Sequence, residues 1–294
     1  MALTEVKDEL LITFMEGITS VPRMDWEACF EVRRDDIPSL KLASMSGIGA
    51  IPVWSGTGDL TPADFNDRAN TSITYEKYGI EGQLNKYDRL DVPGLEAGAM
   101  AKMGVAVGNT MGAIAADRLN DIYAVTTTSG DGVALASDSH PLASGGVRDN
   151  LLASAFDRSA AMVAFNLASL WTSYHGQEED FSEDNFTFLG SPLDTGLRET
   201  YREVFSSQVS SSQMQTNAAL DAKVTPLIWQ RLTSSARWAF ISRERTPLIY
   251  WIREAPENTI TISETSRQLK IGVDFGIGTG VRPDPVGIIA SKTD

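Results

Sequence analysis

The chain has little of what most enzyme and metal sites are built from. Among its 294 residues there is one cysteine, Cys29, and there are two histidines, His140 and His175. A single cysteine excludes an intramolecular disulfide and a metal site built from several thiolates, and it fits synthesis inside a cell. A mechanism that needs a neutral-pH imidazole therefore has only two candidate residues.

Positive charge is also scarce. The chain carries 25 Lys and Arg against 39 Asp and Glu, a formal charge of −14, and no Lys/Arg run is long enough to bind a row of phosphates. Tight, direct binding of nucleic acid is therefore not expected. Apolar residues make up 42% and charged residues 22% of the chain, which is typical of a folded protein with one elaborate domain or two ordinary ones.

Long apolar runs are missing as well. The N-terminal stretch has Lys7, Asp8 and Glu9 where a signal peptide needs an unbroken apolar core. The most apolar window, Met103–Ala116, is shorter than the roughly 20 residues that a membrane span requires. Neither export nor a membrane helix is predicted, so the glycosylation patterns at Asn70 and Asn185 predict no modification.

The clearest predicted helix runs from Pro93 to about Leu119. Its start is placed at Pro93 because the fixed φ of proline suits the first turn of a helix. Its apolar residues recur every three or four positions and predict one buried face: Met100, Met103, Val107, Met111 and Ile114. Gly104, Gly108 and Gly112 form a second stripe, and each glycine costs the helix about 1 kcal/mol relative to alanine. Close packing of another backbone on this stripe would explain that cost.

Two further helices are expected in the middle of the chain. Asn150 is the predicted N-cap of a helix that reaches Trp171, and Asp194 is the predicted N-cap of a helix over Leu197–Phe205. The acidic segment 176–185 lies between them and has five carboxylates. A solvated loop is the preferred interpretation, and a divalent-cation site is the alternative.

Strands are expected toward both ends. The first fifty residues, with an amphipathic stretch over Glu5–Glu16, are interpreted as an arm that packs on something else. Ile51–Trp54 is a predicted short strand, and residues 55–72 are a long polar connection that is either functional or floppy. A strand pattern resumes at Ile73, with a change of phase near Lys77 that predicts a β-bulge.

Beyond residue 236 the pattern is one of strands. They are predicted at Trp238–Ser242, Leu248–Ile252, Ile260–Ile262 and Leu269–Ile277, and the last alternates strictly between apolar and other residues. Helices in the middle and strands at both ends indicate an α+β chain.

One group of neighbours invites a hydrolase hypothesis. Asp138, Ser139 and His140 supply the residue types of a catalytic triad, but no nucleophile elbow accompanies them and a triad is defined by spatial geometry. The preferred interpretation is structural, with His140 held in an extended conformation by Pro141.

Two other patterns imitate known motifs. Asp274-Phe275-Gly276 matches the metal-binding tripeptide of protein kinases, but the other kinase motifs are missing. Gly276, Gly278 and Gly280 resemble a phosphate cradle, but residues 281–285 contain two prolines and block the helix that would have to follow. A turn is predicted there instead. We therefore predict no catalytic, cofactor-binding or metal-binding residues, no cofactor and no enzyme activity.

Three segments carry a family resemblance. They are DGVALASDSHPLASGGVRDNLL (131–152), FTFLGSPLDTGLRETYREVF (186–205) and AKVTPLIWQRLTSSARWAFISRERTPLIYW (222–251). In order and spacing they resemble the major capsid (major head) protein family of tailed double-stranded DNA phages, over most of the chain. None is a strict signature by itself, and the first is the strongest match.

The resemblance implies an α+β architecture in five parts. Residues 1–48 would be an N-terminal arm and 49–91 an extended, hairpin-like loop that lies across a neighbouring subunit. Residues 92–121 would supply the spine helix of a peripheral domain, whose long strands come from 236–294. Residues 122–235 would form an axial domain around five-fold and six-fold axes. Removing residues 55–72 should then leave a folded subunit that does not assemble.

The function implied by the resemblance is structural. Copies would join as pentamers and hexamers into an icosahedral head that encloses double-stranded DNA without tight specific binding. A separate scaffolding protein, a portal and possibly a decoration protein are the implied partners; the implied location is the virion, after assembly in the host cytoplasm. Lys77 and Lys86 are the only lysines near the loop, so no cross-link is predicted. The alternatives are a cellular nanocompartment shell of the same fold around a cargo enzyme and, more distantly, a soluble hydrolase.

Overall fold

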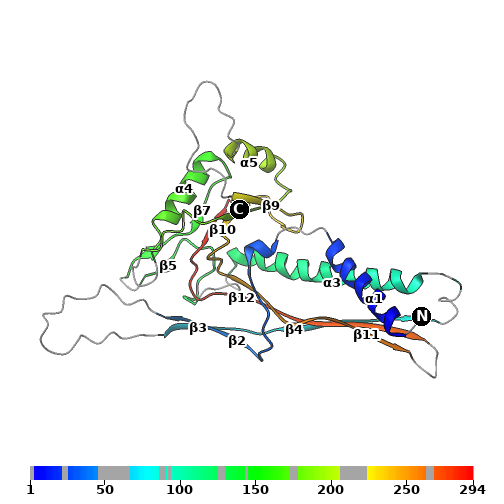
Figure 1. The fold of residues 1–294 in the computed structure, drawn as a ribbon. Coiled ribbons are helices and arrows are strands. Elements are labelled where there is room, and N and C mark those ends of the chain that lie inside the picture. The colour runs from blue at the N-terminus through cyan, green and yellow to red at the C-terminus, as the bar shows by residue number, and fades with distance from the viewer. Residues whose placement is uncertain are drawn as a thin grey trace, which may run out of the picture.

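The structure is a computed structural model that describes residues 3–21, 26–45, 67–85, 91, 94–124, 130–142, 145–172, 178–205, 224–262 and 268–293. The described chain forms two lobes, a long flat one and a more compact one above it (Figure 1). The predicted α+β class is confirmed, since helices and two main sheets are both present.

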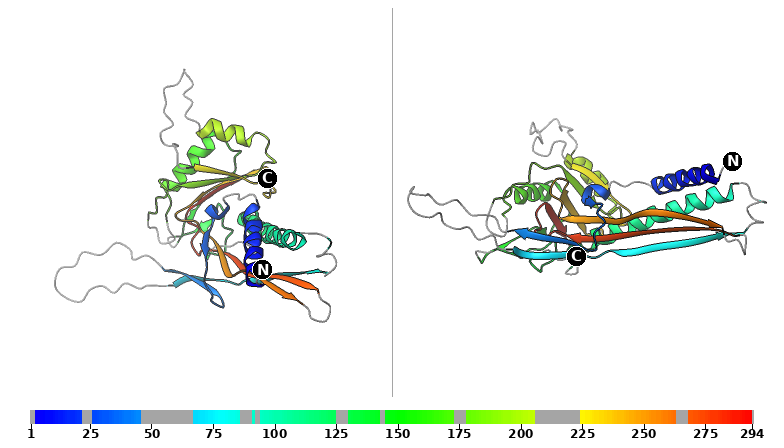
Figure 2. Two further views of the ribbon diagram at one scale, coloured as in Figure 1. Left: turned by 45° about the vertical axis from the view of Figure 1, so that its right-hand side comes forward. Right: turned by 60° about the horizontal axis from the view of Figure 1, so that its bottom comes forward.

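The long lobe is built on a four-stranded sheet in the order β1-β11-β12-β4. Its strands are β1 (Glu31–Arg33), β11 (Leu248–Ile262), β12 (Leu269–Val281) and β4 (Glu76–Leu84). The 26-residue helix α3 (Leu95–Asn120) lies along one face of this sheet (Figures 1 and 2). Alternate residues of β12 are buried beneath α3, beginning at Leu269, as their alternation predicts.

Helix α1 (Leu3–Ser20) packs against α3 through the predicted glycine stripe. A Cβ atom on Gly104 would lie 2.2 Å from the carbonyl oxygen of Phe14, and one on Gly108 would lie 2.9 Å from that of Ile18. Side chains are thus excluded at the contact, and the prediction that another backbone approaches this stripe is confirmed for these two glycines. Gly112 instead faces the ring of Trp229. The arm therefore finds a partner within its own chain.

Strands β2 (Leu40–Met45) and β3 (Asp67–Ile73) form a separate antiparallel pair. The chain then crosses β12 at Gly278 and Gly280, where added Cβ atoms would meet the carbonyl oxygen of Thr74 at 2.6 Å and the side chain of Ile73 at 2.3 Å. The turn predicted for this glycine series is therefore wrong: the glycines lie inside β12, and they allow another segment to cross it closely.

The compact lobe contains a five-stranded sheet in the order β7-β13-β10-β8-β9. The strands are β7 (Leu151–Leu152), β13 (Ile288–Lys292), β10 (Arg237–Ser242), β8 (Phe186–Gly190) and β9 (Val224–Ile228). Helices α4 (Arg158–Ser169) and α5 (Leu197–Phe205) cover one face, over a second hydrophobic core rich in aromatic side chains. Short elements complete the fold: η1 (Trp26–Cys29), η2 (Asp121–Tyr123), β5 (His140–Pro141) and β6 (Val147–Arg148).

Two predicted N-caps are wrong. Helix α4 begins at Arg158, and its N-cap is Asp157, whose side chain accepts a hydrogen bond of 2.7 Å from the backbone of Ala160. Asn150 is instead fully buried in the loop before α4. Helix α5 begins at Leu197, the first residue predicted for it, and Asp194 lies in the turn before the helix, where its side chain accepts a hydrogen bond from the backbone of Gly196. At α4, the capping role that the sequence assigned to Asn150 belongs to Asp157.

Two strand predictions also need correction. The phase change near Lys77 reflects the passage from β3 to β4, and β4 pairs with β12 without a bulge. The strands predicted at Leu248–Ile252 and Ile260–Ile262 are one strand, β11, with register shifts between Ile252 and Glu257. The start of the predicted spine helix at Pro93, the predicted strand Ile51–Trp54 and most of the predicted connection 55–72 lie outside the described residues.

Candidate functional site

The segment around His140 was the main candidate for chemistry, and the structure gives it a different partner. His140 and the side chain of Asp131 are both fully buried, and Nδ1 of His140 lies 2.8 Å from Oδ2 of Asp131. The other oxygen of Asp131 accepts a hydrogen bond of 3.1 Å from the backbone of Val133. Asp131 therefore holds both the turn that begins this segment and the histidine near its end.

Both ring nitrogens of His140 face oxygen atoms. The Asn150 amide is oriented by two hydrogen bonds: its Oδ1 accepts from the backbone of Ser137 at 2.8 Å, and its Nδ2 donates to the carbonyl of Leu135 at 2.9 Å. Nε2 of His140 lies 3.2 Å from that Oδ1 and 3.3 Å from the same carbonyl, so it faces two acceptors. With the Asp131 carboxylate on Nδ1 as well, oxygen atoms occupy the hydrogen-bonding positions of both ring nitrogens.

The residues of the hydrolase hypothesis are not brought together. Asp138 and Ser139 are exposed, and the Ser139 hydroxyl lies 3.1 Å from that of Ser137. Since both nitrogens of His140 already have oxygen partners, neither is positioned to accept a proton from a nucleophile. His175, the other histidine, lies outside the described residues.

Arg148 extends the buried polar network. Its guanidinium bonds the carboxylate of Asp284 at 2.9 Å, donates to the carbonyl of Thr172 and lies 4.7 Å from the centre of the Trp171 ring. The Trp171 ring also contacts His140 edge-on. The pairing of Asp131 with His140 and of Arg148 with Asp284 could not be recognised from the sequence, because only the fold brings these residues together. The network ties these separate segments together.

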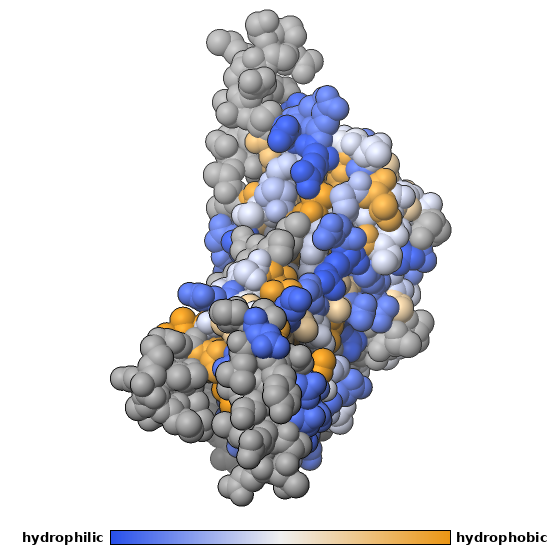
Figure 3. Space-filling model, turned by 90° about the vertical axis from the view of Figure 1, so that its right-hand side faces the viewer, coloured by the Kyte–Doolittle hydropathy of each residue, from blue (hydrophilic) through white to orange (hydrophobic). Residues whose placement is uncertain are grey.

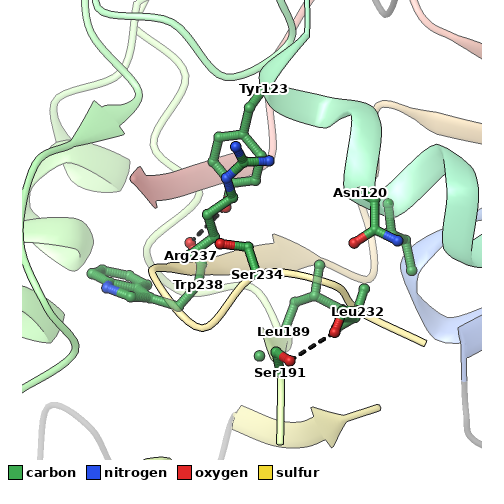
Figure 4. Close-up of a pocket in the computed structure, with 10 residues that line it drawn as sticks. Asn120, Tyr123, Leu189, Ser191, Leu232, Ser234, Arg237 and Trp238 are labelled. Atoms are coloured by element: carbon green, nitrogen blue, oxygen red, sulfur yellow. Dashed lines mark hydrogen bonds between the residues drawn. The ribbon is translucent and has the colours of Figure 1, made fainter. Parts of the chain in front are cut away.

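A small crevice lies where the end of α3 meets the five-stranded sheet (Figure 4). Its walls are held by hydrogen bonds from the Ser191 hydroxyl to the carbonyl of Leu232, 2.7 Å, and from the Tyr123 hydroxyl to the carbonyl of Trp238, 3.0 Å. The Arg237 guanidinium stacks over the Tyr123 ring at 5.0 Å. The enclosed volume of about 20 Å³ holds one water molecule, which excludes it as a substrate pocket.

The remaining candidates are a metal site, the acidic segment 176–185 and Cys29. Within the ranges that the structure describes, no three His, Cys, Asp or Glu side chains come together as a metal site, and no helix is long and apolar enough to cross a membrane. In the acidic segment, Asp184 accepts a hydrogen bond from the hydroxyl of Ser242 at 2.6 Å. Cys29 is buried, and burial raises the pKa of its thiol to about 12, which disfavours the reactive thiolate.

The fold of this chain matches solved structures of capsid subunits. The cyanophage P-SCSP1u capsid superposes with a TM-score of 0.58 at 12% identity, over 91% of this chain and 87% of that one. The cyanophage Pam1 capsid gives 0.55 at 15% identity, over 89% and 87%. A virus-like particle from Pyrococcus furiosus gives 0.51 at 9% identity, over 97% and 98%. This chain has the phage capsid fold.

Sequence comparison adds nothing further, because no family model and no curated protein matches this chain. The capsid fold therefore rests on structure alone, at identities of 15% or less in the three structures named.

On the face shown in Figure 3, the described residues are mainly hydrophilic, and the apolar ones form small separate groups. Two groups lie on helices: Leu11, Ile12 and Met15 on α1, and Met162, Val163 and Leu170 on α4. Apolar side chains that stay exposed on a helix are candidates for contact with another molecule.

Proposed function

We propose that this chain is the repeating subunit of an icosahedral phage head, a major capsid protein that assembles as pentamers and hexamers around double-stranded DNA. The observation that carries the proposal is the capsid fold, matched over about nine-tenths of the chain. The fully occupied hydrogen bonds of His140 support a structural role for the segment that otherwise suggests catalysis.

The parts of the subunit follow from the same proposal. Residues 1–48 serve as the arm and 49–91 as the extended loop. The peripheral domain combines 92–121 with 236–294, which fits the packing of α3 along β12 and β11. Residues 122–235 form the axial domain, and β10 and β13 extend the sheet of that region.

The net negative charge of the chain is consistent with a shell that encloses DNA without binding it tightly. A subunit of formal charge −14 repels the phosphates of a packed genome, so the genome can enter and leave freely. A scaffolding protein, a portal and a decoration protein are the proposed partners, and the virion, assembled in the host cytoplasm, is the proposed location.

A nanocompartment shell is the second candidate, and one observation favours keeping it. The match to the Pyrococcus furiosus particle covers 97% of this chain and 98% of that one, so the two chains are almost the same size. Such a shell would enclose a cargo enzyme in place of a genome.

Two measurements test the proposal in sequence. Electron microscopy of the purified protein under assembly conditions should show closed shells, and uniformly monomeric particles would overturn the assignment as a shell subunit. The contents of shells isolated from their native setting then decide between the candidates: nuclease-protected double-stranded DNA supports the phage head, and a co-purifying enzyme with no DNA supports the nanocompartment.

A further inference from the structure

Helix α4 leaves one apolar side uncovered in the compact lobe. Val163, Leu167 and Leu170 recur at i, i+4 and i+7 and therefore share a side of the helix, and of these Leu167 is partly buried against the second core. Ala161 and Ala164, on the neighbouring side, pack onto the sheet. Leu170 is 75% exposed and Val163 is 44% exposed, so this side lacks a partner among the described residues.

Negative charge surrounds the end of this stripe. Leu170 is the C-cap of α4, and the aligned carbonyl groups of the last turn give the helix terminus a partial negative charge. Glu178 is exposed and forms a β-bridge with Thr172, two residues after Leu170, and Asp180 is exposed two residues further on. The α4 surface is thus a protruding leucine with a negative rim.

A groove of about 320 Å³ lies between α5 and β9 and has the complementary character. Tyr201, Pro226 and Ile228 give it apolar walls, and Arg198 and Arg202 complete its lining. Among the described residues, no carboxylate forms an ion pair with either arginine. Strand β9 is the outermost strand of its sheet, but Pro226 lacks a backbone N–H, so a partner would bind through side chains and not by adding a strand.

The two surfaces lie toward opposite edges of the five-stranded sheet. Helix α4 packs on β13, toward one edge of the sheet, whereas α5 packs on β9, the other edge (Figure 1). They are therefore placed to meet between copies, in a head-to-tail contact that closes into a ring. We infer that Leu170 of one subunit inserts into the α5–β9 groove of the next, with Glu178 and Asp180 facing Arg198 and Arg202. This contact, which rests on the proposed shell function, would build the pentamers and hexamers.

A cysteine cross-link tests the contact directly. The single native cysteine is buried and unreactive, so a Leu170→Cys, Ile228→Cys variant introduces the only accessible thiols. Oxidation of assembled protein should give a ladder of covalent oligomers that ends at closed pentamers and hexamers, whereas each single-cysteine variant should give none. Well-formed shells of the double variant that yield only monomers would overturn the inference.

A mixing experiment tests the head-to-tail geometry. Leu170→Asp removes the inserting side chain, and Arg202→Glu reverses charge in the groove, so each variant alone should form no rings. In a mixture, Leu170 of the Arg202→Glu variant can still insert into the intact groove of the Leu170→Asp variant. Each pair therefore makes one contact, and the mixture should sediment as dimers.

A charge exchange tests the proposed ion pairs. Arg202→Glu combined with Glu178→Arg should recover at least part of the lost assembly. Shells formed by both single variants would overturn the assigned contact while leaving the shell function intact, whereas wild-type protein that forms no shells would count against the function itself. Retained cooperative unfolding of each variant confirms that it folds.

Discussion

The buried pair of Asp131 and His140 sets the energetics of the segment before α4. Both side chains are fully buried, and the Asp131 carboxylate has the His140 ring as a partner at 2.8 Å. Breaking a buried ion pair by removing one partner is costly, because the remaining charge is left without compensation in a low-dielectric site.

We therefore expect His140→Ala to lower the free energy of unfolding by about 3–5 kcal/mol. The exposed neighbour supplies the control, since Ser139→Ala should change stability by no more than about 0.5 kcal/mol. Urea unfolding of both variants measures the difference. If Ser139→Ala were as damaging as His140→Ala, the structural role assigned to His140 would be wrong.

Cys29 gives a prediction about alkaline pH. Burial is the main cause that raises its thiol pKa from the ordinary 9.0 to about 12. Below the ordinary value the thiol is protonated in both states; above it, only the unfolded chain loses the proton, so the free energy of unfolding falls as pH rises from 9.0 toward 12.

The test compares wild type with Cys29→Ala by denaturant unfolding at several pH values across this range. Tyr78 and Tyr201, whose phenol pKa values burial likewise raises to about 12, are present in both proteins, so the difference isolates the thiol. The variant should lose less stability than wild type. If the free energy of unfolding fell equally with pH in both proteins, the thiol would ionise as easily in the folded protein as in the unfolded chain.

Residue types alone led to His140, but not to its role. The sequence placed His140 in an extended segment before Pro141, and it does lie in strand β5. It offered Asp138 as the neighbouring acid, whereas the true partner is Asp131, nine residues away across a loop. Asn150 looked like a helix cap because asparagine commonly caps helices, and only the fold shows that its amide is buried in the same network.

At the scale of elements, the contact of α1 with α3 depends on the absence of side chains. Gly104 and Gly108 let the two backbones approach, whereas Gly98, on the same helix, has open space where a Cβ would lie. The three glycines share a helix but differ in surroundings, which makes them a matched set.

Gly104→Ala should destabilise the protein by about 1–3 kcal/mol, because the added methyl group collides with the backbone of Phe14. Gly98→Ala should stabilise it by up to about 1 kcal/mol, because alanine favours the helix and meets nothing. Thermal unfolding measures both changes. A stabilising Gly104→Ala would contradict the close approach of α1.

Elements with a strong periodic pattern were predictable and those fixed by distant contacts were not. The helix expected to end near Leu119 corresponds to α3, and the strands expected at Trp238–Ser242 and Leu269–Ile277 are β10 and the first part of β12. The turn predicted at residues 276–280 was wrong because glycine is favoured both in tight turns and where another segment crosses a strand closely. Only the crossing at residues 73–75, about two hundred positions earlier, distinguishes them.

On the scale of the whole molecule, the proposed extended loop separates folding from assembly. The sequence predicts that removing residues 55–72 leaves a folded subunit that does not assemble. Since β3 begins at Asp67, the deletion that keeps the β2–β3 pair complete is residues 55–66. This variant should retain a cooperative unfolding transition yet form no shells in electron micrographs; loss of the transition would show that the segment belongs to the subunit's own fold.

The overall architecture was accessible from sequence through its order of segments more than through any single motif. Three segments, 131–152, 186–205 and 222–251, pointed to the capsid fold by their order and spacing, and the structure places them in β5–β7, in β8 with α5, and in β9 with β10 and β11. The partners of the exposed apolar sides of α1 and α4 could not be predicted in this way, because in the proposed function they belong to other copies.

The central claim is that copies of this chain build a closed shell. Its most direct test is a three-dimensional reconstruction, by cryo-electron microscopy, of the purified protein under assembly conditions. The account predicts icosahedral particles made of pentamers and hexamers, with the five-stranded sheet of each subunit near the five-fold and six-fold axes. Protein that stays monomeric across these conditions, or that forms only particles without icosahedral symmetry, would contradict it.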